Sequence, residues 1–235
     1  MSFLFNTGKM HQQKVRRFSK PLDLYLHQWV EKEIIKRYEL SCLSPHLACL
    51  NFFYEKKGMV LTPFYDSKAD LIIDSCHLPF KNHYWDVWLD AMHIHTLNAL
   101  PYYFKEVQRV LKKGGWFMGG FLGGDTAKHL RHHFIHIESK LYGTASLRFM
   151  PTIQPDYFTS LMANMGFKNS VVECEKIQVS YKTFKAFIED IRMTGENGIL
   201  GTPFTYQRAL WQDISDHWQS LMPLTLEMIF FKGQT

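Results

Sequence analysis

Residues 84–122 read YWDVWLDAMHIHTLNALPYYFKEVQRVLKKGGWFMGGFL, and this stretch predicts a strand, a helix and a second strand. The strands are expected at 84–89 and 116–122. Between them, residues 99–113 carry apolar side chains at helical spacing, and the helix ends at Lys112, Lys113 and Gly114. The apolar stripe consists of Leu100, Tyr103, Phe104, Val107, Val110 and Leu111. This order is typical of a βαβ unit, in which the two strands run parallel.

The same alternation of strands and helices continues on both sides of this stretch. We expect further strands at 38–43, 59–64, 69–74 and 171–179, and further helices at 21–37, 44–57, 156–165 and 182–193. The helix at 44–57 rests on Ser44 as N-cap, on Pro45 in its first turn, and on Leu47 and Leu50 at helical spacing. The alternation predicts an α/β fold with a mostly parallel sheet flanked by helices.

Composition narrows the class of protein. The chain has 235 residues, of which 46% are apolar, so it can form a substantial core. No apolar run approaches the roughly 20 residues that span a bilayer. The four cysteines, Cys42, Cys49, Cys76 and Cys174, form no CxxC pair. This argues against a zinc ribbon or a redox dithiol and suits a reducing compartment.

The N-terminal segment is basic, and the net charge of the chain is +5. Five basic residues precede the first acid, Asp23: Lys9, Lys14, Arg16, Arg17 and Lys20. Such a segment is either a transit peptide or a basic strip that lies on the domain, and we favour the second. We expect a bacterial cytoplasmic protein, with the mitochondrial matrix as the alternative.

Four acids lie near the expected ends of strands: Glu39, Asp66, Asp74 and Asp90. Ligands of open parallel sheets bind beyond the carboxyl ends of the strands. A carboxylate after the second strand can accept both hydroxyls of a ribose, and one on the next strand can accept from an adenine amine. Asp66 and Asp74 fit these two places. The other possibility is that these acids are solvated caps.

Several segments resemble the class I S-adenosylmethionine (SAM) methyltransferases of the type 11-like kind. Asp74 stands four residues before Leu78-Pro79-Phe80, and LKKGG at 111–115 resembles the family's LKPGG. FLGGDTAKHLR at 121–131 and MTGEN at 193–197 resemble the methyltransferase-like assembly factors of respiratory complex I. The malonyl-carrier-protein O-methyltransferases of biotin synthesis are also similar. The resemblance implies a Rossmann-like class I methyltransferase fold and SAM as the cofactor.

The resemblance also implies roles for individual residues. The expected cofactor-binding residues are Glu39, Ser41, Cys42, Asp66, Asp74 and Leu78. The substrate side is expected to include Asp125, Thr126 and Arg131, with Asp125 or Thr126 capping a helix. His95 follows the fourth strand, where it either orients a substrate or acts as a base, or is simply a turn histidine.

The family's glycine loop is the main departure. YELSCLSPHL, residues 38–47, aligns with that loop but carries Ser41, Leu43 and Pro45 in place of its three glycines. Leu43 would fill space where bare backbone approaches SAM, and Pro45 removes a backbone donor. The spacing from Asp66 to Leu78 is also short for a helix between strands two and three. We therefore expect SAM binding to be weak or absent.

A row of histidines lies at a place where the resembling family uses no metal. His129, His132, His133 and His136 lie at i, i+3, i+4 and i+7, on one face of the expected helix. Two histidines at such spacing can bind zinc when a third ligand comes from elsewhere. The sequence has no HExxH glutamate there, so we favour a solvated or partly packed helix face and predict no metal site.

These observations leave three hypotheses of function. The first is a SAM-dependent methyltransferase in which methyl transfer is weakened or lost, with a protein or an acyl carrier as substrate. The second is a cofactor-deficient protein of the same fold, a pseudoenzyme that acts by binding as a respiratory-complex assembly factor. The third, an RNA-directed enzyme, ranks last because the sequence has no recognisable RNA-binding module, and we expect no nucleic-acid partner.

We expect a single methyltransferase-like domain over residues 1–235. Residues 1–37 would form the basic segment and first helix, and residues 38–125 the core sheet with the cofactor side. Residues 126–235 would add a helical insertion and the C-terminal strands.

Overall fold

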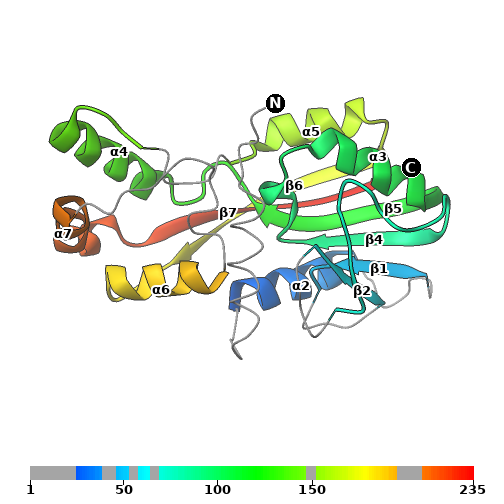
Figure 1. Ribbon diagram of the computed structural model, residues 1–235, viewed down its shortest axis with the longest axis horizontal. Helices are drawn as coiled ribbons and strands as arrows, with labels where there is room; N and C mark the ends of the chain where they lie inside the picture. Colours follow the sequence, from blue (N-terminus) through cyan, green and yellow to red (C-terminus); the bar gives the residue numbers. More distant parts are fainter. Residues whose placement is uncertain (1–24, 39–45, 53–57, 64–68, 147–151, 195–207) are drawn as a thin grey trace.

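The computed structural model of the protein describes residues 25–38, 46–52, 58–63, 69–146, 152–194 and 208–235. Its centre is a seven-stranded sheet with the strand order β3-β2-β1-β4-β5-β7-β6 (Figure 1). The strands are β1 (Leu47–Leu50), β2 (Met59–Thr62), β3 (Leu71–Ile72), β4 (Trp85–Ala91), β5 (Leu111–Leu122), β6 (Lys168–Val179) and β7 (Leu224–Gln234). The first five are parallel neighbours, and β7 runs antiparallel to β5 and β6. The predicted mostly parallel sheet is therefore confirmed.

Helices cover both faces of the sheet. The helical elements are α2 (Tyr25–Arg37), η2 (Ile94–Thr96), α3 (Leu100–Val110), α4 (Lys128–Tyr142), α5 (Pro155–Asn164), α6 (Phe184–Thr194), α7 (Arg208–Asp216) and η3 (Trp218–Leu221). One core cluster joins α3 and α5 to one face, and a second joins α2 to the other (Figure 1). No helix in the described part of the chain is both long enough and apolar enough to span a membrane.

Helix α3 follows the expected pattern closely. Pro101 lies in the first turn, and the stripe that includes Tyr103, Phe104 and Val107 is fully buried. The helix ends at Val110, three residues before the predicted end, because Leu111 already pairs with Trp85 as the start of β5. Gly114, with φ 74°, lies within β5 and does not end the helix.

The predicted helix at 44–57 is wrong at residues 47–50. These residues form β1, whose four side chains are all buried and which pairs with β2 on one side and β4 on the other. A short, continuous apolar run such as LACL fits a buried parallel strand as well as a helix, and periodicity cannot separate the two. The rest of that prediction, and most of the strand predicted at 38–43, lie outside the described residues.

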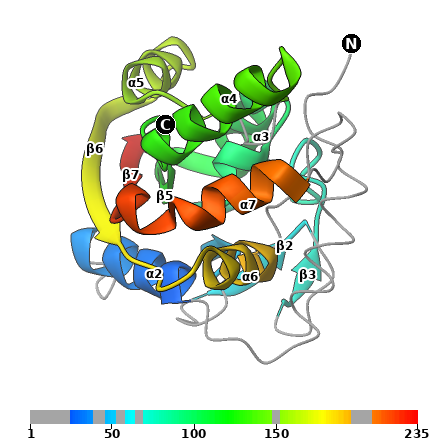
Figure 2. The ribbon, with the colours of Figure 1, turned by 90° about the vertical axis from the view of Figure 1, so that its left-hand side faces the viewer.

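A third group of helices lies beyond the carboxyl ends of the parallel strands. Helices α4, α6 and α7 share an apolar cluster with η3 and the start of β7. Figure 2 shows these three helices together in front of the sheet. Helix α4 begins at Lys128, and its N-cap is Ala127 with φ 49° and no side-chain cap, so the predicted capping by Asp125 or Thr126 is wrong. The turn is formed instead by backbone bonds to β7, including Ala127 N to Thr225 O.

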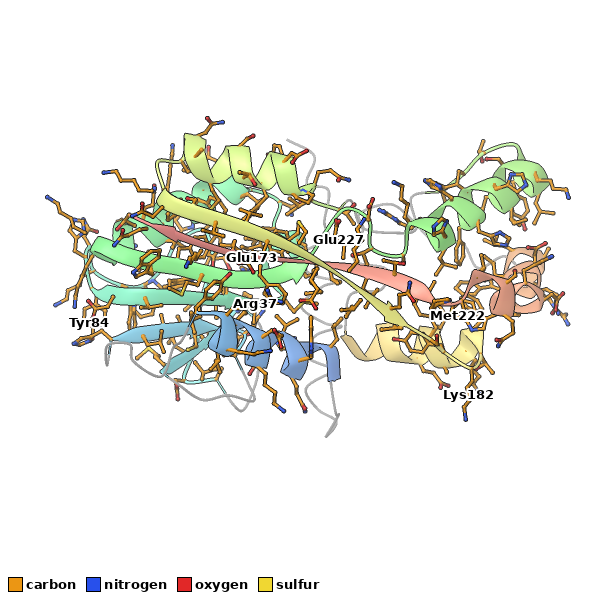
Figure 3. All side chains as sticks on the ribbon, turned by 180° about the vertical axis from the view of Figure 1, so that it is seen from behind. Arg37, Tyr84, Glu173, Lys182, Met222 and Glu227 are labelled. Atoms are coloured by element: carbon orange, nitrogen blue, oxygen red, sulfur yellow. The ribbon has the colours of Figure 1, made fainter. Side chains whose placement is uncertain are left out.

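An ion pair ties α2 to the far edge of the sheet. Arg37 donates to Glu173 at 2.7 Å and also to Glu175, both on β6. Its guanidinium lies 4.2 Å from the ring centre of Phe230 on β7. Figure 3 shows Arg37 directed toward Glu173 across the underlying strands. Helix α2 is thus anchored across the sheet from β1 to β6.

The aromatic core between α3, α5 and the sheet can be tested at Phe104. Its ring is fully buried against Phe117, Phe158 and Phe167, with ring centres 5.4–5.9 Å apart. We expect Phe104→Ala to lower the free energy of unfolding by about 3–5 kcal/mol, because it leaves a cavity that its neighbours cannot fill. Urea unfolding measures this.

The matched control is Tyr102→Ala, two residues earlier on the same helix, where the side chain is 64% exposed. It should change stability by about 0.5 kcal/mol or less. Equal losses in the two variants would contradict the packing described for α3.

Candidate functional site

The sheet has a topological switch point between β1 and β4. From β1 the chain passes outward to β2 and β3, and it then returns to place β4 on the other side of β1. The crevice at such a point is where open α/β sheets bind ligands. At this edge Leu50 pairs with Asp90. Just beyond them, Asn51 and Met92 have φ of 57° and 54°. A bulky residue such as methionine rarely adopts this backbone region, and strain of this kind gathers at functional sites.

Side chains fill the end of β1. Asn51 is buried, its carbonyl accepts a 2.7 Å bond from His27 Nε2 of α2, and its Oδ1 accepts a 3.1 Å bond from Thr62 at the end of β2. The next residue, Phe52, is fully buried. The position that follows strand one is therefore occupied by a satisfied polar cluster and an aromatic ring.

A buried carboxylate organises the end of β4. Asp90 Oδ2 accepts hydrogen bonds from Tyr103 Oη at 2.5 Å and from His93 Nδ1 at 3.1 Å. His93 Nε2 lies 3.0 Å from Ser75 Oγ, and Trp88 Nε1 donates to Tyr103 Oη at 2.9 Å. Asp90 Oδ1 is also buried, yet it has no hydrogen-bond partner among the described residues.

The serine, histidine and aspartate of this network stand in the order of a hydrolase triad. Asp90 fixes the proton of His93 on Nδ1, which leaves Nε2 to accept from Ser75. All three residues are 5% exposed or less, so the serine hydroxyl is enclosed rather than presented to a substrate. We call the four residues Ser75, Asp90, His93 and Tyr103 the polar bracket, because their hydrogen bonds join β4, α3 and the loop after β3.

Tyr103 stays protonated because of its surroundings. Burial raises the pKa of its phenol well above the ordinary value, and the charge of Asp90 and the hydrogen bond to it raise the pKa further. The phenol therefore remains a donor to Asp90 over the whole physiological range.

Among the predicted cofactor residues, the structure describes Asp74 and Leu78. Asp74 follows β3 as predicted, but its side chain is 65% exposed and accepts from Cys76 N at 2.8 Å and from His77 Nδ1 at 3.2 Å. Leu78 donates its N–H to Glu106 Oε2, and its carbonyl accepts from Arg109, both at 2.8 Å. The hydrogen bond from Arg109 lowers the pKa of Glu106, so the acceptor stays ionised. Glu39, Ser41, Cys42, Leu43, Pro45 and Asp66 lie outside the described residues.

His95 lies directly after β4, as predicted. It is buried in the 3-10 turn η2, two residues beyond His93. Its role as a base or as a positioning group stays a prediction.

The residues of the bracket were missed as a site: Asp90 was noted as an acid near a strand end, whereas Ser75, His93 and Tyr103 were not singled out. A polar residue within the apolar strand at 85–91 was the available signal.

The predicted substrate-side residues gather where β5 leads into α4. Asp125 contacts Lys176 at 2.7 Å and Lys128 at 3.2 Å, and these lysines lower the pKa of its carboxyl. Thr126 Oγ1 donates to the carbonyl of Glu227 on β7, and Arg131 donates to the carbonyl of Gly124 and to Thr152. Figure 3 shows Glu227 on β7. These side chains bond to their own chain, and their contact with a substrate stays a prediction.

The connections at the carboxyl edge are short. Residues 51–58 join β1 to β2 and residues 63–70 join β2 to β3, so each connection has eight residues. Parallel crossovers that carry a helix need roughly a dozen residues or more. The N–H of Leu78 is taken by Glu106, and Asp74 is turned into its own loop. Weak or absent SAM binding stays a prediction, because most of the expected cofactor residues lie outside the described residues.

The polar bracket can be tested at Tyr103. Tyr103→Phe should lower the free energy of unfolding by about 1–3 kcal/mol, because Trp88 loses its acceptor and buried Asp90 loses a donor. Folding raises the pKa of Tyr103, so the protonated phenol contributes stability that is fully present below about pH 10, the ordinary tyrosine value. This contribution is lost as the pH rises toward the pKa of the folded state. The variant should therefore lose less stability above about pH 10 than the wild type does.

Unfolding in urea at a series of alkaline pH values measures both effects, with Tyr102→Phe on the exposed face of α3 as the control. If Tyr103→Phe has the alkaline stability profile of the control, the bracket does not hold a protonated phenol.

Comparisons with known proteins agree with the fold. The family described as "Methyltransferase domain" matches residues 55–119. The human mitochondrial arginine-hydroxylase NDUFAF5 is 29% identical over 187 residues, which cover 77% of this chain and 51% of the relative. The malonyl-[acyl-carrier protein] O-methyltransferase of Nitrosospira multiformis is 28% identical over 141 residues, which cover 57% and 44% of the two chains. The chain thus spans about half the length of these curated relatives.

A solved SAM-dependent methyltransferase of Thermotoga maritima superposes with a TM-score of 0.52 at 13% identity. The match covers 96% of this chain and 97% of that one. Likeness at this level of identity concerns the fold. The chain therefore has the fold of the class I methyltransferases, and its predicted resemblance to that family is confirmed.

Proposed function

We propose that this chain is a cofactor-deficient protein of the methyltransferase fold, which acts by binding a partner rather than by methyl transfer. The observation that carries the proposal is the filled carboxyl edge at the switch point. Asn51, bonded to His27 and Thr62, and the fully buried Phe52 stand where the first strand ends. The resemblance to the complex I assembly factors suggests that the function is the assembly of a respiratory complex.

The short connections support the same conclusion. Eight residues lead from β1 to β2 and eight from β2 to β3. Crossovers of this length leave little backbone for a phosphate- or nucleoside-binding loop followed by a full helix. A protein that keeps the sheet but shortens these segments keeps a binding surface at the expense of a cofactor pocket.

A second candidate is weak methyl transfer to an acyl carrier or a protein. It is favoured by the family match over residues 55–119 and by a relative named for methylating malonyl-[acyl-carrier protein]. Glu39 and Asp66 would then hold the nucleoside, with His95 beside the substrate. For location we keep the bacterial cytoplasm, with the mitochondrial matrix as the alternative.

Binding of SAM separates the two candidates. A ligand at 100 times its dissociation constant adds about 2.7 kcal/mol to stability, which for a chain of this size raises the melting temperature by roughly 5–10 °C. We expect millimolar SAM to shift the melting temperature by less than about 1 °C, and titration calorimetry to show no saturable heat. A methyltransferase of proven SAM affinity serves as the positive control in the same buffer.

A saturable, one-to-one SAM isotherm at micromolar concentration would overturn the proposal. Transfer of a labelled methyl group to an acyl carrier protein would establish the second candidate. A variant with glycine at positions 41, 43 and 45 tests the predicted loop itself, although these positions precede β1 (Leu47–Leu50) rather than follow it. Restored SAM binding in that variant would show that the segment before β1 belongs to the cofactor site.

A further inference from the structure

Two helices that are distant in sequence bring three metal-ligating residues together. His133 lies on α4, Asp213 lies on α7, and His217 directly follows the end of α7. His133 Nε2 is 3.3 Å from Asp213 Oδ1, and His217 Nδ1 is 3.3 Å from the same oxygen. One ligand atom of each residue lies within 4.8 Å of those of the other two.

The framework around these residues is rigid. Leu130, Phe134 and Ile137 of α4 pack with Leu210 and Ile214 of α7 in one buried cluster. Asp213 and His217 are four residues apart, and His217 N bonds to Asp213 O at 3.0 Å, so the helical turn continues to the histidine. Residues at this spacing lie on one face of a helix. The two histidine rings are 5.8 Å apart, centre to centre.

The 3.3 Å separation of His133 Nε2 from Asp213 Oδ1 matches the geometry of a metal site. Imidazole nitrogen and carboxylate oxygen bind zinc at about 2.0–2.2 Å, usually in a tetrahedron. Two ligand atoms at that bond length and at the tetrahedral angle lie roughly 3.3–3.5 Å apart. Asp213 Oδ1 stands at such a distance from His133 Nε2.

The orientation of the buried atoms points to the same conclusion. His133 Nε2 and Asp213 Oδ1 are both buried and, among the described residues, neither has a hydrogen-bond partner, although they are only 3.3 Å apart. Burying two polar atoms that do not hydrogen-bond to each other destabilises the fold, unless another atom or ion contacts both of them.

The third residue, His217, would bind through Nε2. His217 Nδ1 donates to the backbone carbonyl of Asp213 at 2.9 Å, which leaves the lone pair on Nε2. Metal-binding histidines commonly fix their rings by such a bond to a backbone carbonyl.

We propose that His133, Asp213 and His217 form a binding site for a divalent transition-metal ion of the zinc type, between α4 and α7. Two imidazoles and one carboxylate suit zinc and its first-row neighbours rather than magnesium or calcium. Three protein ligands leave at least one coordination position for water or for a group on a partner. Among the four histidines of α4, His133 is the ligand, whereas His129, His132 and His136 are exposed. The site is independent of SAM binding.

The test uses the full chain after treatment with a chelator. Calorimetry with Zn²⁺ should show one saturable site, and Co²⁺ should give the visible absorption of a tetrahedral or five-coordinate ion. His133→Ala and Asp213→Asn should each weaken Zn²⁺ binding by at least about tenfold. His132→Ala, at the exposed neighbouring position of α4, should bind as the wild type does, and circular dichroism checks that every variant is folded.

The competing explanation is that the three residues form a proton-linked ion pair without metal. Failure of the wild type to bind one equivalent of Zn²⁺ or Co²⁺ overturns the proposal in favour of that explanation. Unchanged affinity in folded His133→Ala and Asp213→Asn also overturns it, because the ion would then sit on other residues.

Discussion

The buried carboxylate of Asp90 is the constraint on which the carboxyl edge depends. A charged group in the protein interior is costly unless donors surround it, and removing one donor leaves that cost exposed. Here the donors come from two elements: Tyr103 from α3, and His93 from the turn after β4. Through His93 the network reaches Ser75, so the loop after β3 is joined to the same network by one further hydrogen bond. The neighbouring strand approaches closely at the same place, since a Cβ on Gly119 of β5 would lie 2.3 Å from the Asp90 carbonyl.

This arrangement shows what holds the switch point together within the described residues. The parallel order β3-β2-β1-β4-β5 fixes where the strand ends meet, whatever fills the space beyond them. In this chain the space holds Asn51, which is hydrogen-bonded to Thr62, the buried ring of Phe52, and the Asp90 network, in which Oδ2 is hydrogen-bonded and Oδ1 has no partner among the described residues. The strained backbone at Asn51 and Met92 persists because both residues are enclosed by packed side chains.

The sequence predicted the parts of the fold that rest on long, regular patterns. The helix at 100–110 and the strands beside it were predictable because six apolar residues recur at one period. β1 was not, because LACL is too short to distinguish a strand from a helix and only its pairing with β2 and β4 decides. The bracket was predictable in part: Asp90 stands out in an apolar strand, but its donor Tyr103 reads as one more apolar helix residue. The histidine row on α4 was visible, whereas its two partners come from a helix about 80 residues later, and no local pattern joins them.

The position of the proposed metal site follows from the sheet. β5 pairs antiparallel with β7 through Leu122 and Met228, so the segments just beyond these strand ends lie side by side. Helix α4 leaves the end of β5 after five residues, and α7 with η3 leads into the start of β7. The pairing of two strands thus sets His133 opposite Asp213 before any ion is present. The apolar cluster of Phe134, Leu210 and Ile214 then holds the helices in place. Unlike a zinc finger, a site between packed helices does not need the metal in order to fold. The packed helices hold its ligands in place before the ion binds, and this favours binding because little conformational entropy is lost.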